Sequence, residues 1–304
     1  MSTDLPFHAR FAGLDWSADL PLDQFDSAAQ GQSGAIAVVR QAAPGTIQAQ
    51  REVGRARIGS NGVRFDCDDE VALEMRGGET IGWVPGPDWT GQLPVSFFSS
   101  MAAITVAWRG LLPLHASSVV IGGKAWLIAG GPGAGKSTLT AELLSAGAKL
   151  LADDLTVLTP GPQPMVWRGR PAMRLHPTTC DLFEQTAPPE PAQDERGKLL
   201  VRPAARAADR AWPIGGILLL SNIVGREHGL AETAMAYGSI LFRPRIISAL
   251  PGHKRLRKGL LELTRAAPMG LIESLWQFDP DSRAARIERV FDTVARLEAG
   301  RSTV

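Results

Sequence analysis

The residues from Gly130 to Ser137 read Gly-Gly-Pro-Gly-Ala-Gly-Lys-Ser and match the phosphate-loop pattern without a mismatch. Glycines let the backbone fold tightly, so that successive N–H groups and the positive end of the following helix face one anion. Lys136 would then reach the terminal phosphates, and the hydroxyl of Ser137 would give Mg²⁺ one oxygen ligand. The residues predicted to bind the nucleotide are Gly130, Gly131, Gly133, Ala134, Gly135, Lys136, Ser137 and Thr138.

A plain glycine-rich turn is the alternative to a phosphate loop, because short patterns also arise by chance. The position of the motif argues against that alternative. It directly follows the apolar run 126–129 and precedes an uninterrupted helical pattern, which is the strand–loop–helix order that phosphate binding requires. The sequence therefore predicts a bound nucleotide, ATP with Mg²⁺.

Two adjacent carboxylates, Asp153 and Asp154, end the next apolar strand. Beside a triphosphate such a pair can divide the work: one carboxylate holds the metal ion and the other accepts the proton of an incoming hydroxyl. Asp-Asp also commonly opens a turn, here before Leu155. Next to a complete phosphate loop, we favour the functional interpretation.

His115 immediately precedes the strand pair that leads into the loop. A lone histidine among apolar residues is more often structural than catalytic. Its place in the chain nevertheless makes it a candidate for assisting charge or proton movement at the terminal phosphate.

Two groups of basic residues could also serve the site. Six of them lie between Arg243 and Lys258, and such a run is usually a solvated face, although it could clamp an anionic peptide or lend an arginine to the phosphoryl group. A second group could close over substrate as a lid and consists of Arg170, Arg174, Arg196 and Lys198.

The elements around the loop form an alternating pattern. The sequence predicts strands at 117–121, 125–129 and 150–152, with a helix at 136–146 that Gly147 closes. We expect a parallel α/β unit with its ligand edge at the strand ends. The segment 159–213 has little periodicity, 215–221 is a further strand, and 282–297 has the spacing of an amphipathic helix.

The first part of the chain has a different pattern. Short β-prone runs alternate with turn residues from about residue 34 to 84, and an apolar stretch with helical length, 95–108, follows. We therefore expect a small, mostly antiparallel β module at 1–94 and a catalytic domain at 95–304. The predicted strands of the module are 35–40, 56–58, 63–66, 71–75 and 80–84.

Composition sets the limits on partners. The 304 residues are 44% hydrophobic with a net charge of +1, so no whole-chain field attracts nucleic acid or a membrane. The apolar stretch 95–108 is too short to cross a bilayer. Cys67 and Cys180 lie far apart without metal-ligand spacing, which argues against a disulfide framework and a structural zinc site. With no secretory signal in view, we expect a cytoplasmic protein.

The order of these blocks resembles the catalytic domain of HPr kinase/phosphorylase and its shorter relatives. The resemblance covers about 111–157 and rests on Leu114-His115-Ala116-Ser117, on the loop Gly130–Ser137, and on Gly147-Ala148-Lys149-Leu150-Leu151-Ala152-Asp153-Asp154. It implies an α/β fold, the P-loop-containing, phosphoenolpyruvate carboxykinase-like fold of the HPr kinase C-terminal domain, here preceded by the β-rich module.

The resemblance also implies roles for single residues. Lys136 and Ser137 would bind phosphates and Mg²⁺, and Asp153 would be the general base that activates a serine hydroxyl. Asp154 would be a metal-side carboxylate, and His115 would neighbour the reacting phosphate.

The match to the family is incomplete beyond the aspartates. The bifunctional enzymes carry a Glu-x-Arg-Gly-Leu-Gly-like signature, of which Arg168-Gly169 is the only part present here. The chain is similar instead to HPr kinase-related proteins that accompany peptide-modification genes, including those that phosphorylate serine in lasso-peptide precursors. HPr enzymes are hexamers, so the resemblance leaves room for a homo-oligomer.

The leading hypothesis from sequence is an ATP- and Mg²⁺-dependent kinase that acts on a serine hydroxyl of a peptide or protein. The β module would then present the peptide, for example by adding it as a strand at a sheet edge. The alternatives are a kinase of a small-molecule hydroxyl, and a nucleotide-dependent switch. Asp153 and His115 count against the switch, because a protein that only binds nucleotide needs no base.

Overall fold

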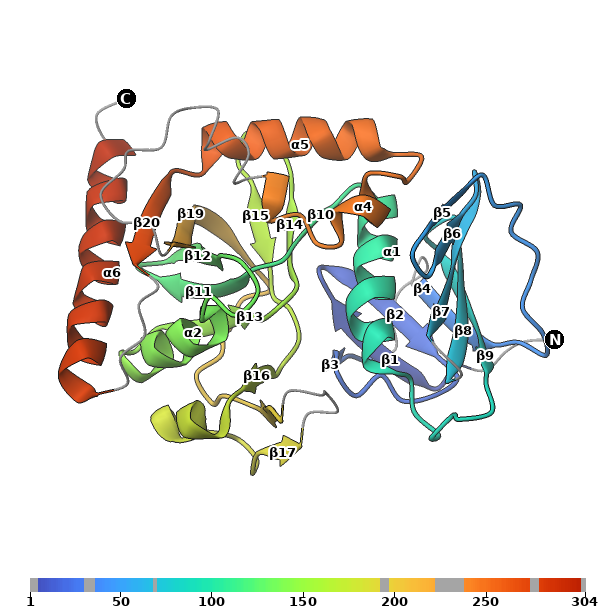
Figure 1. Cartoon of the computed structure of the whole chain (residues 1–304), viewed down its shortest axis with the longest axis horizontal. Coiled ribbons are helices and arrows are strands. Elements are labelled where there is room, and N and C mark those ends of the chain that lie inside the picture. Colours follow the sequence, from blue (N-terminus) through green and yellow to red (C-terminus); the bar gives the residue numbers. More distant parts are fainter. Residues whose placement is uncertain are drawn as a thin grey trace. The chain divides into compact units, whose positions relative to one another are not determined.

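The chain divides into two compact units in the computed structural model, which describes residues 5–29, 36–67, 70–191, 197–221, 238–273 and 279–301 (Figure 1). The first unit contains Met1–Pro113 and Leu241–Arg257, and the second contains Leu114–Ile240 and Lys258–Val304. The chain is a mixed α/β protein with several sheets.

A large sheet dominates the first unit. Among the described residues nine strands pair in the order β3-β1-β2-β4-β9-β8-β7-β6-β5. The β2–β4 and β4–β9 pairs are parallel and the others antiparallel. The strands are β1 (Phe7–Phe11), β2 (Leu14–Ala18), β3 (Asp26–Ser27), β4 (Ile36–Arg40), β5 (Arg51–Val53), β6 (Ala56–Ile58), β7 (Gly62–Cys67), β8 (Val71–Arg76) and β9 (Thr80–Pro85).

The strands predicted at 56–58, 63–66, 71–75 and 80–84 are present, and the one predicted from residue 35 begins at Ile36, the first residue described there. The pattern missed β1, β2, β3 and β5. The first three precede the part of the chain where turns mark regular strand spacing. The short β5 begins with two charged residues, so it gives no apolar alternation.

The predicted helix at 95–108 is confirmed, as η1 (Phe97–Met101), a π-helical turn, followed by α1 (Ala102–Trp108). Phe97 packs against Trp16 and Phe25 with ring centroids 6.3 and 6.2 Å apart, and Phe98 lies 5.2 Å from Phe25. These aromatic contacts tie the helix to the first sheet. The division between the units therefore falls after Pro113, and the boundary predicted near residue 95 lies inside the first unit.

The chain crosses between the units three times. Strand β10 (Leu112–Leu114) contains the first division. The segment Leu241–Arg257 returns to the first unit and carries α4 (Pro244–Ile247) and the start of α5 (His253–Ala266), whose remainder belongs to the second unit. The sequence analysis did not predict that this segment returns to the first unit.

The sheet of the second unit has the order β14-β15-β19-β12-β11-β13, and β20 also pairs with β19. Strand β12 is parallel to β19, whereas β11 is antiparallel to both β12 and β13. Its elements are β11 (Ser117–Ile121), β12 (Lys124–Ala129), α2 (Lys136–Ser145), β13 (Lys149–Ala152), β14 (Thr156–Thr159), β15 (Met165–Trp167), β19 (Ala211–Ser221), β20 (Met269–Glu273) and α6 (Pro280–Arg301).

The expected parallel unit is corrected in one respect. Strands β12 and β13 point the same way, but β11 lies between them. The reason is the tight turn at Gly122-Gly123, which folds β11 back on β12 as a hairpin and leaves β13 to pair with the outer edge of β11. The predicted strands, the α2 helix and the C-terminal helix are otherwise where the pattern put them.

The middle segment, 159–213, contains more regular secondary structure than its sequence indicated. Besides β15 it contains β16 (Met173–Leu175), a 3₁₀ turn η2 (Pro177–Leu182), β17 (Glu190–Pro191) and β18 (Leu199–Val201). Strands β16, β18 and β17 form a small sheet in that order. Residues 192–196 of this segment lie outside the described residues.

Trp126 is the largest side chain in the core under α2 and is fully buried. It sits opposite Gly216 in the β12–β19 pair. A Cβ atom on Gly215 or Gly216 would lie 2.5 or 2.6 Å from the indole ring. The two glycines therefore make the space that the indole fills, and they let β19 pass close to β12.

A buried ion pair joins the loop helix α2 to the C-terminal helix α6. Glu142 and Arg286 are 3% and 1% exposed, and Arg286 Nε donates to Glu142 Oε2 at 2.8 Å. A second donation, from Nη2 to Oε1, makes the pair bidentate. Such a pair holds two helices in one relative position, because each charge needs the other in a dry site.

We predict that Arg286→Met lowers the free energy of unfolding by about 3–5 kcal/mol, because it leaves the Glu142 carboxylate buried without its counter-charge. Denaturant titration measures the change. The double variant Glu142→Leu/Arg286→Met should recover most of the loss. Arg289→Met, at an exposed position on the same helix, is the matched control and should change stability by less than about 0.5 kcal/mol. Equal losses in Arg286→Met and Arg289→Met would contradict the assignment.

Candidate functional site

The sheet directions bring three chain segments to one edge. Because β11 is antiparallel to both neighbours, its first residue lies at the edge where β12 and β13 end. Ser117 pairs with Ile128, near the end of β12, and Ser118 pairs with Ala152, the last residue of β13. The phosphate loop, the aspartate pair and the residues around His115 therefore meet at this edge.

The phosphate loop has the conformation that its glycines allow. Gly133 and Gly135 have φ values of 78° and 91°, in the left-handed region that glycine adopts without strain. Helix α2 begins directly after Gly135. The ammonium of Lys136 donates to the carbonyls of Gly130 and Gly131 at 3.0 and 3.2 Å, so it lies across the loop.

The pKa of the Lys136 ammonium depends on burial and on the charges around it. Burial lowers the pKa of its ammonium below the ordinary value, whereas Asp154 and then Asp153 act in the opposite direction. An anion in the loop would add to the effect of the two carboxylates and favour the charged ammonium.

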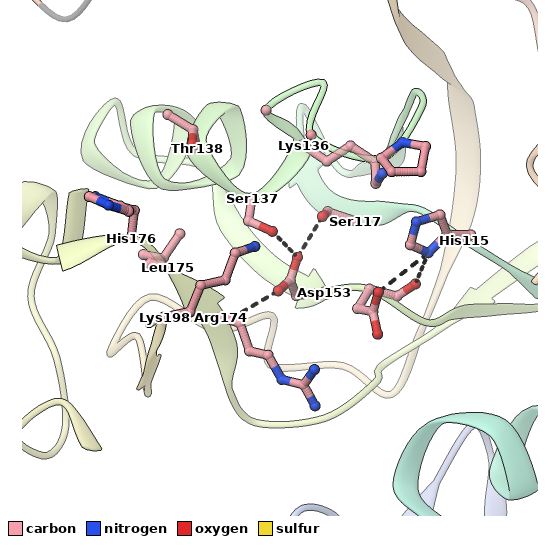
Figure 2. Close-up of a pocket in the computed structure, with 14 residues that line it drawn as sticks. His115, Ser117, Lys136, Ser137, Thr138, Asp153, Arg174, Leu175, His176 and Lys198 are labelled. Carbon is pink, nitrogen blue, oxygen red and sulfur yellow. Dashed lines mark hydrogen bonds and ion pairs between the residues drawn. The ribbon is translucent and has the colours of Figure 1, made fainter. Parts of the chain in front are cut away.

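The Asp153 carboxylate accepts several hydrogen bonds, and only 2% of the residue's surface is exposed. Its Oδ1 accepts hydrogen bonds from Ser117 Oγ at 2.6 Å and from Ser137 Oγ at 3.1 Å, and its Oδ2 accepts one from the backbone N–H of Arg174 at 3.1 Å. Figure 2 shows these bonds converging on Asp153 from three directions. Both oxygens of the buried carboxylate are thus satisfied.

Asp154 lies in a different environment, with its side chain 30% exposed. His115 Nδ1 lies 3.3 Å from Asp154 Oδ1, and Arg170 Nη2 lies 3.6 Å from Oδ2. Burial alone would raise the pKa of Asp154, but the hydrogen bond from His115 and the charges of Arg170 and Arg174 outweigh it and hold the pKa at about 2. Its backbone φ of 66° is unusual for a residue other than glycine.

A cavity of about 410 Å³ connects these groups. Its volume lies within the ordinary range of small-molecule sites. Of the predicted residues, those that line it are His115, Gly133, Gly135, Lys136, Ser137, Thr138, Asp153, Asp154, Arg174 and Lys198.

The wall opposite the phosphate loop comes from the small sheet. Arg174 is on β16, His176 follows it, and Lys198 precedes β18. Lys198 points toward Asp153 and Ser137 (Figure 2), and its charge acts on Lys136.

The basic residues that were predicted to form a lid lie in different places. Arg174 and Lys198 line the cavity, whereas Arg170 is buried beside Asp154. Arg196 lies outside the described residues. The basic run from Arg243 contributes no residue to the lining of this cavity.

Two lining residues with hydroxyl or imidazole side chains were not assigned a role from the sequence. Ser117 binds Asp153, and its only signal was a hydroxyl at the start of a strand. His176 contacts the Thr178 hydroxyl at 3.0 Å while lining the cavity. Its proximity depends on the fold of the small sheet, which had no sequence signal.

A divalent metal ion would find a limited set of protein ligands here. No cluster of three or more His, Cys, Asp or Glu side chains with metal-binding geometry occurs within the described part of the chain. The Ser137 hydroxyl and the Asp153 carboxylate are in contact and offer hard oxygens. This sparse set suits Mg²⁺, which keeps several waters and is bound through one or two carboxylates plus substrate phosphates.

Both cysteine thiols, Cys67 and Cys180, are free and buried. Burial raises the pKa of the Cys67 thiol to about 11, and it also raises that of Cys180. A raised thiol pKa disfavours the reactive thiolate, so neither cysteine has the electrostatic setting of a nucleophile.

Comparison with known proteins finds solved structures that are similar to this chain. The chain is similar to the Hpr(Ser) kinase/phosphatase from Coxiella burnetii over 39% of this chain and 71% of that chain, with 16% identity and a TM-score of 0.26. A similarity of this size does not establish a shared fold or activity. No family model and no curated protein matches the sequence. None of the helices described here has the length and apolar character needed to span a membrane.

We predict that His115→Ala raises the pKa of Asp154 from about 2, because the variant loses the contact of the imidazole with the Asp154 carboxylate. The folded-state pKa lies below the unfolded value of about 3.9, so this carboxylate stabilises the fold above about pH 4. That contribution is lost as the pH falls toward 2.

Carbon-13 NMR titration of the carboxyl groups measures the change, with Asp154→Asn identifying the resonance. His176→Ala is the control, because His176 lines the same cavity but does not act on Asp154. An unchanged Asp154 titration in His115→Ala would show that the imidazole does not set this pKa.

Proposed function

We propose that the chain is an ATP- and Mg²⁺-dependent kinase that transfers the γ-phosphoryl group to a serine hydroxyl of a peptide or protein. The observation that carries the proposal is the meeting of Lys136, Ser137, Asp153 and Asp154 in one cavity. A phosphate loop supplies anion binding, and paired carboxylates beside it supply the groups that phosphoryl transfer needs.

The nucleotide would bind through the loop. The backbone N–H groups around Gly133 and Gly135, together with the start of α2, favour a phosphate anion. Lys136 would exchange its two carbonyl contacts for phosphate oxygens. Bound Mg²⁺ would neutralise charge that develops on the phosphates.

The contacts favour a different division of the two aspartates from the one that the family resemblance implies. The resemblance makes Asp153 the base and Asp154 the metal-side carboxylate. Asp153, however, is buried and bonded to Ser137, the hydroxyl expected on Mg²⁺. We therefore propose that Asp153 acts on the metal side and that Asp154, more exposed and beside His115, receives the acceptor hydroxyl.

A carboxylate with a pKa of about 2 is a weak base, so Asp154 would orient the hydroxyl and accept its proton late. Phosphoryl transfer tolerates this, because a loose transition state needs little deprotonation of the nucleophile. His115 and Arg170 would keep Asp154 ionised and hold it in place.

The wall formed by Arg174 and Lys198 adds positive charge opposite the loop. Fixed cations at a transferring phosphoryl group stabilise the charge that its equatorial oxygens carry in the transition state. These two residues give the site more than a nucleotide-binding protein requires, which favours a transferase over a switch. A small-molecule hydroxyl remains the alternative acceptor.

We predict that the wild-type chain transfers labelled phosphate from ATP with Mg²⁺ to serine-containing precursor peptides. Lys136→Ala should reduce this transfer by about 10²–10³-fold, because it removes a cation that stabilises the phosphates. Phosphopeptide mass spectrometry identifies the modified side chain. Lys149→Ala, which replaces an exposed lysine on β13, is the matched control and should retain full activity.

Other acceptors distinguish the alternatives. Transfer to a sugar or nucleoside hydroxyl, without transfer to any peptide, would favour the small-molecule kinase. Slow ATP hydrolysis that no hydroxyl acceptor stimulates would favour the switch.

The proposed roles of Asp153 and Asp154 predict different kinetic effects when each residue is replaced. Asp153→Asn should raise the half-saturating Mg²⁺ concentration by about tenfold or more, because it weakens the metal-side contacts. Asp154→Asn should lower kcat while leaving that concentration close to wild type. Titration of activity with Mg²⁺ at saturating ATP measures both. The opposite pattern would restore the roles that the family resemblance implies.

A further inference from the structure

A second cavity lies within the first unit and has no part in the proposed phosphoryl transfer. Its volume is about 670 Å³, larger than that of the candidate site. One side comes from the end of β5 and the β5–β6 turn, and the other from the α4 segment that returns to this unit late in the chain. The basic run noted in the sequence therefore has a defined structural setting.

The charged side chains that line this cavity are all positive. Arg55, Arg243 and Arg245 contribute to its lining, and all three residues are exposed. Among the described residues that line it, none is Asp or Glu. A surface with this arrangement attracts carboxylates or phosphates and disfavours cations.

The position of Arg243 is fixed by its backbone. Its φ of 46° lies in the left-handed region, which non-glycine residues seldom adopt. Its carbonyl accepts hydrogen bonds from the N–H groups of Ile246 and Ile247 at 2.9 and 3.1 Å, which hold the turn into α4. The arginine is thus presented at the cavity from a defined turn.

The cavity also has an apolar part. Phe65 and Ile246 line it and are almost fully buried, and Val53 lines it at the end of β5. An inorganic anion or a sugar phosphate would leave this apolar surface without a partner. A chain that carries both carboxylates and an apolar side chain would use both parts.

The surroundings favour an extended ligand. Strand β5 is the edge strand of its sheet, and a smaller cavity of about 160 Å³ lies at the other end of the β5–β6 pair. That cavity is lined by Arg51 and by residues of the same returning segment, including His253. Both cavities thus lie along one hairpin, which suits an extended peptide better than a compact molecule.

We propose that the groove between the β5–β6 hairpin and the segment 243–253 binds an acidic peptide segment of a partner protein, through Arg243 and Arg245 and with an apolar side chain against Phe65 and Ile246. The assignment goes beyond the proposed kinase activity and does not depend on it, because binding is measured without nucleotide. Association should weaken as salt is raised.

Fluorescence anisotropy tests the proposal with the full chain. The probe is a short fluorescein-labelled peptide rich in Asp and Glu with leucine at intervals, and the control peptide carries Asn and Gln in place of the acids. The double variant Arg243→Gln/Arg245→Gln should weaken binding of the acidic peptide by about tenfold or more. Val53→Glu, which adds a carboxylate to the groove, should also weaken it.

Arg257→Gln is the matched control, since Arg257 is exposed in the same unit but does not line the cavity. Thermal melts of all variants separate a binding defect from unfolding. Equal affinity of the acidic and amide peptides, or unchanged binding by the double variant, would overturn the proposal. Tight binding of a single-stranded oligonucleotide that the same double variant abolishes would assign the groove to nucleic acid instead.

Discussion

The buried carboxylate of Asp153 is the constraint on which the site depends. A charge removed from water must be satisfied by hydrogen bonds, and here three chain segments supply them: Ser117 at the start of β11, Ser137 at the start of α2, and the backbone of Arg174 on β16. None of these segments is close to another in the sequence. One buried carboxylate therefore joins the β11–β12 hairpin, helix α2 and the small sheet at a common point.

The neighbouring aspartates show how two identical groups acquire different properties. Asp153 is enclosed by hydroxyl and amide donors, whereas Asp154 is partly exposed and faces an imidazole and a guanidinium. The backbone at Asp154 lies in the left-handed region. Under the proposed division, Asp153 would act on the metal side and Asp154 would receive the acceptor hydroxyl.

The sequence was most informative about the short, contiguous motifs. The phosphate loop and the aspartate pair are contiguous motifs, and each follows a strong apolar strand, so their elements could be predicted. Arg174 and Lys198 could be named only as basic residues in an irregular segment, because their approach to the loop depends on pairing between β16 and β18. The position of β11 between β12 and β13, and the return of 241–257 to the first unit, are likewise nonlocal. The hydrophobic periodicity of a strand does not indicate which other strand it pairs with.

The two compact units are interleaved along the chain, and this has a consequence for biogenesis. When residue 240 has been synthesised, the first unit still lacks its segment 241–257, and the second lacks β20 and α6. The partner of Glu142 in the buried ion pair, Arg286, is made later still. The first unit therefore has all of its residues only after Arg257 has been made, and the second only after α6 has been made. A truncation before residue 241 would leave both units incomplete, whereas one after residue 257 would remove residues from the second unit alone.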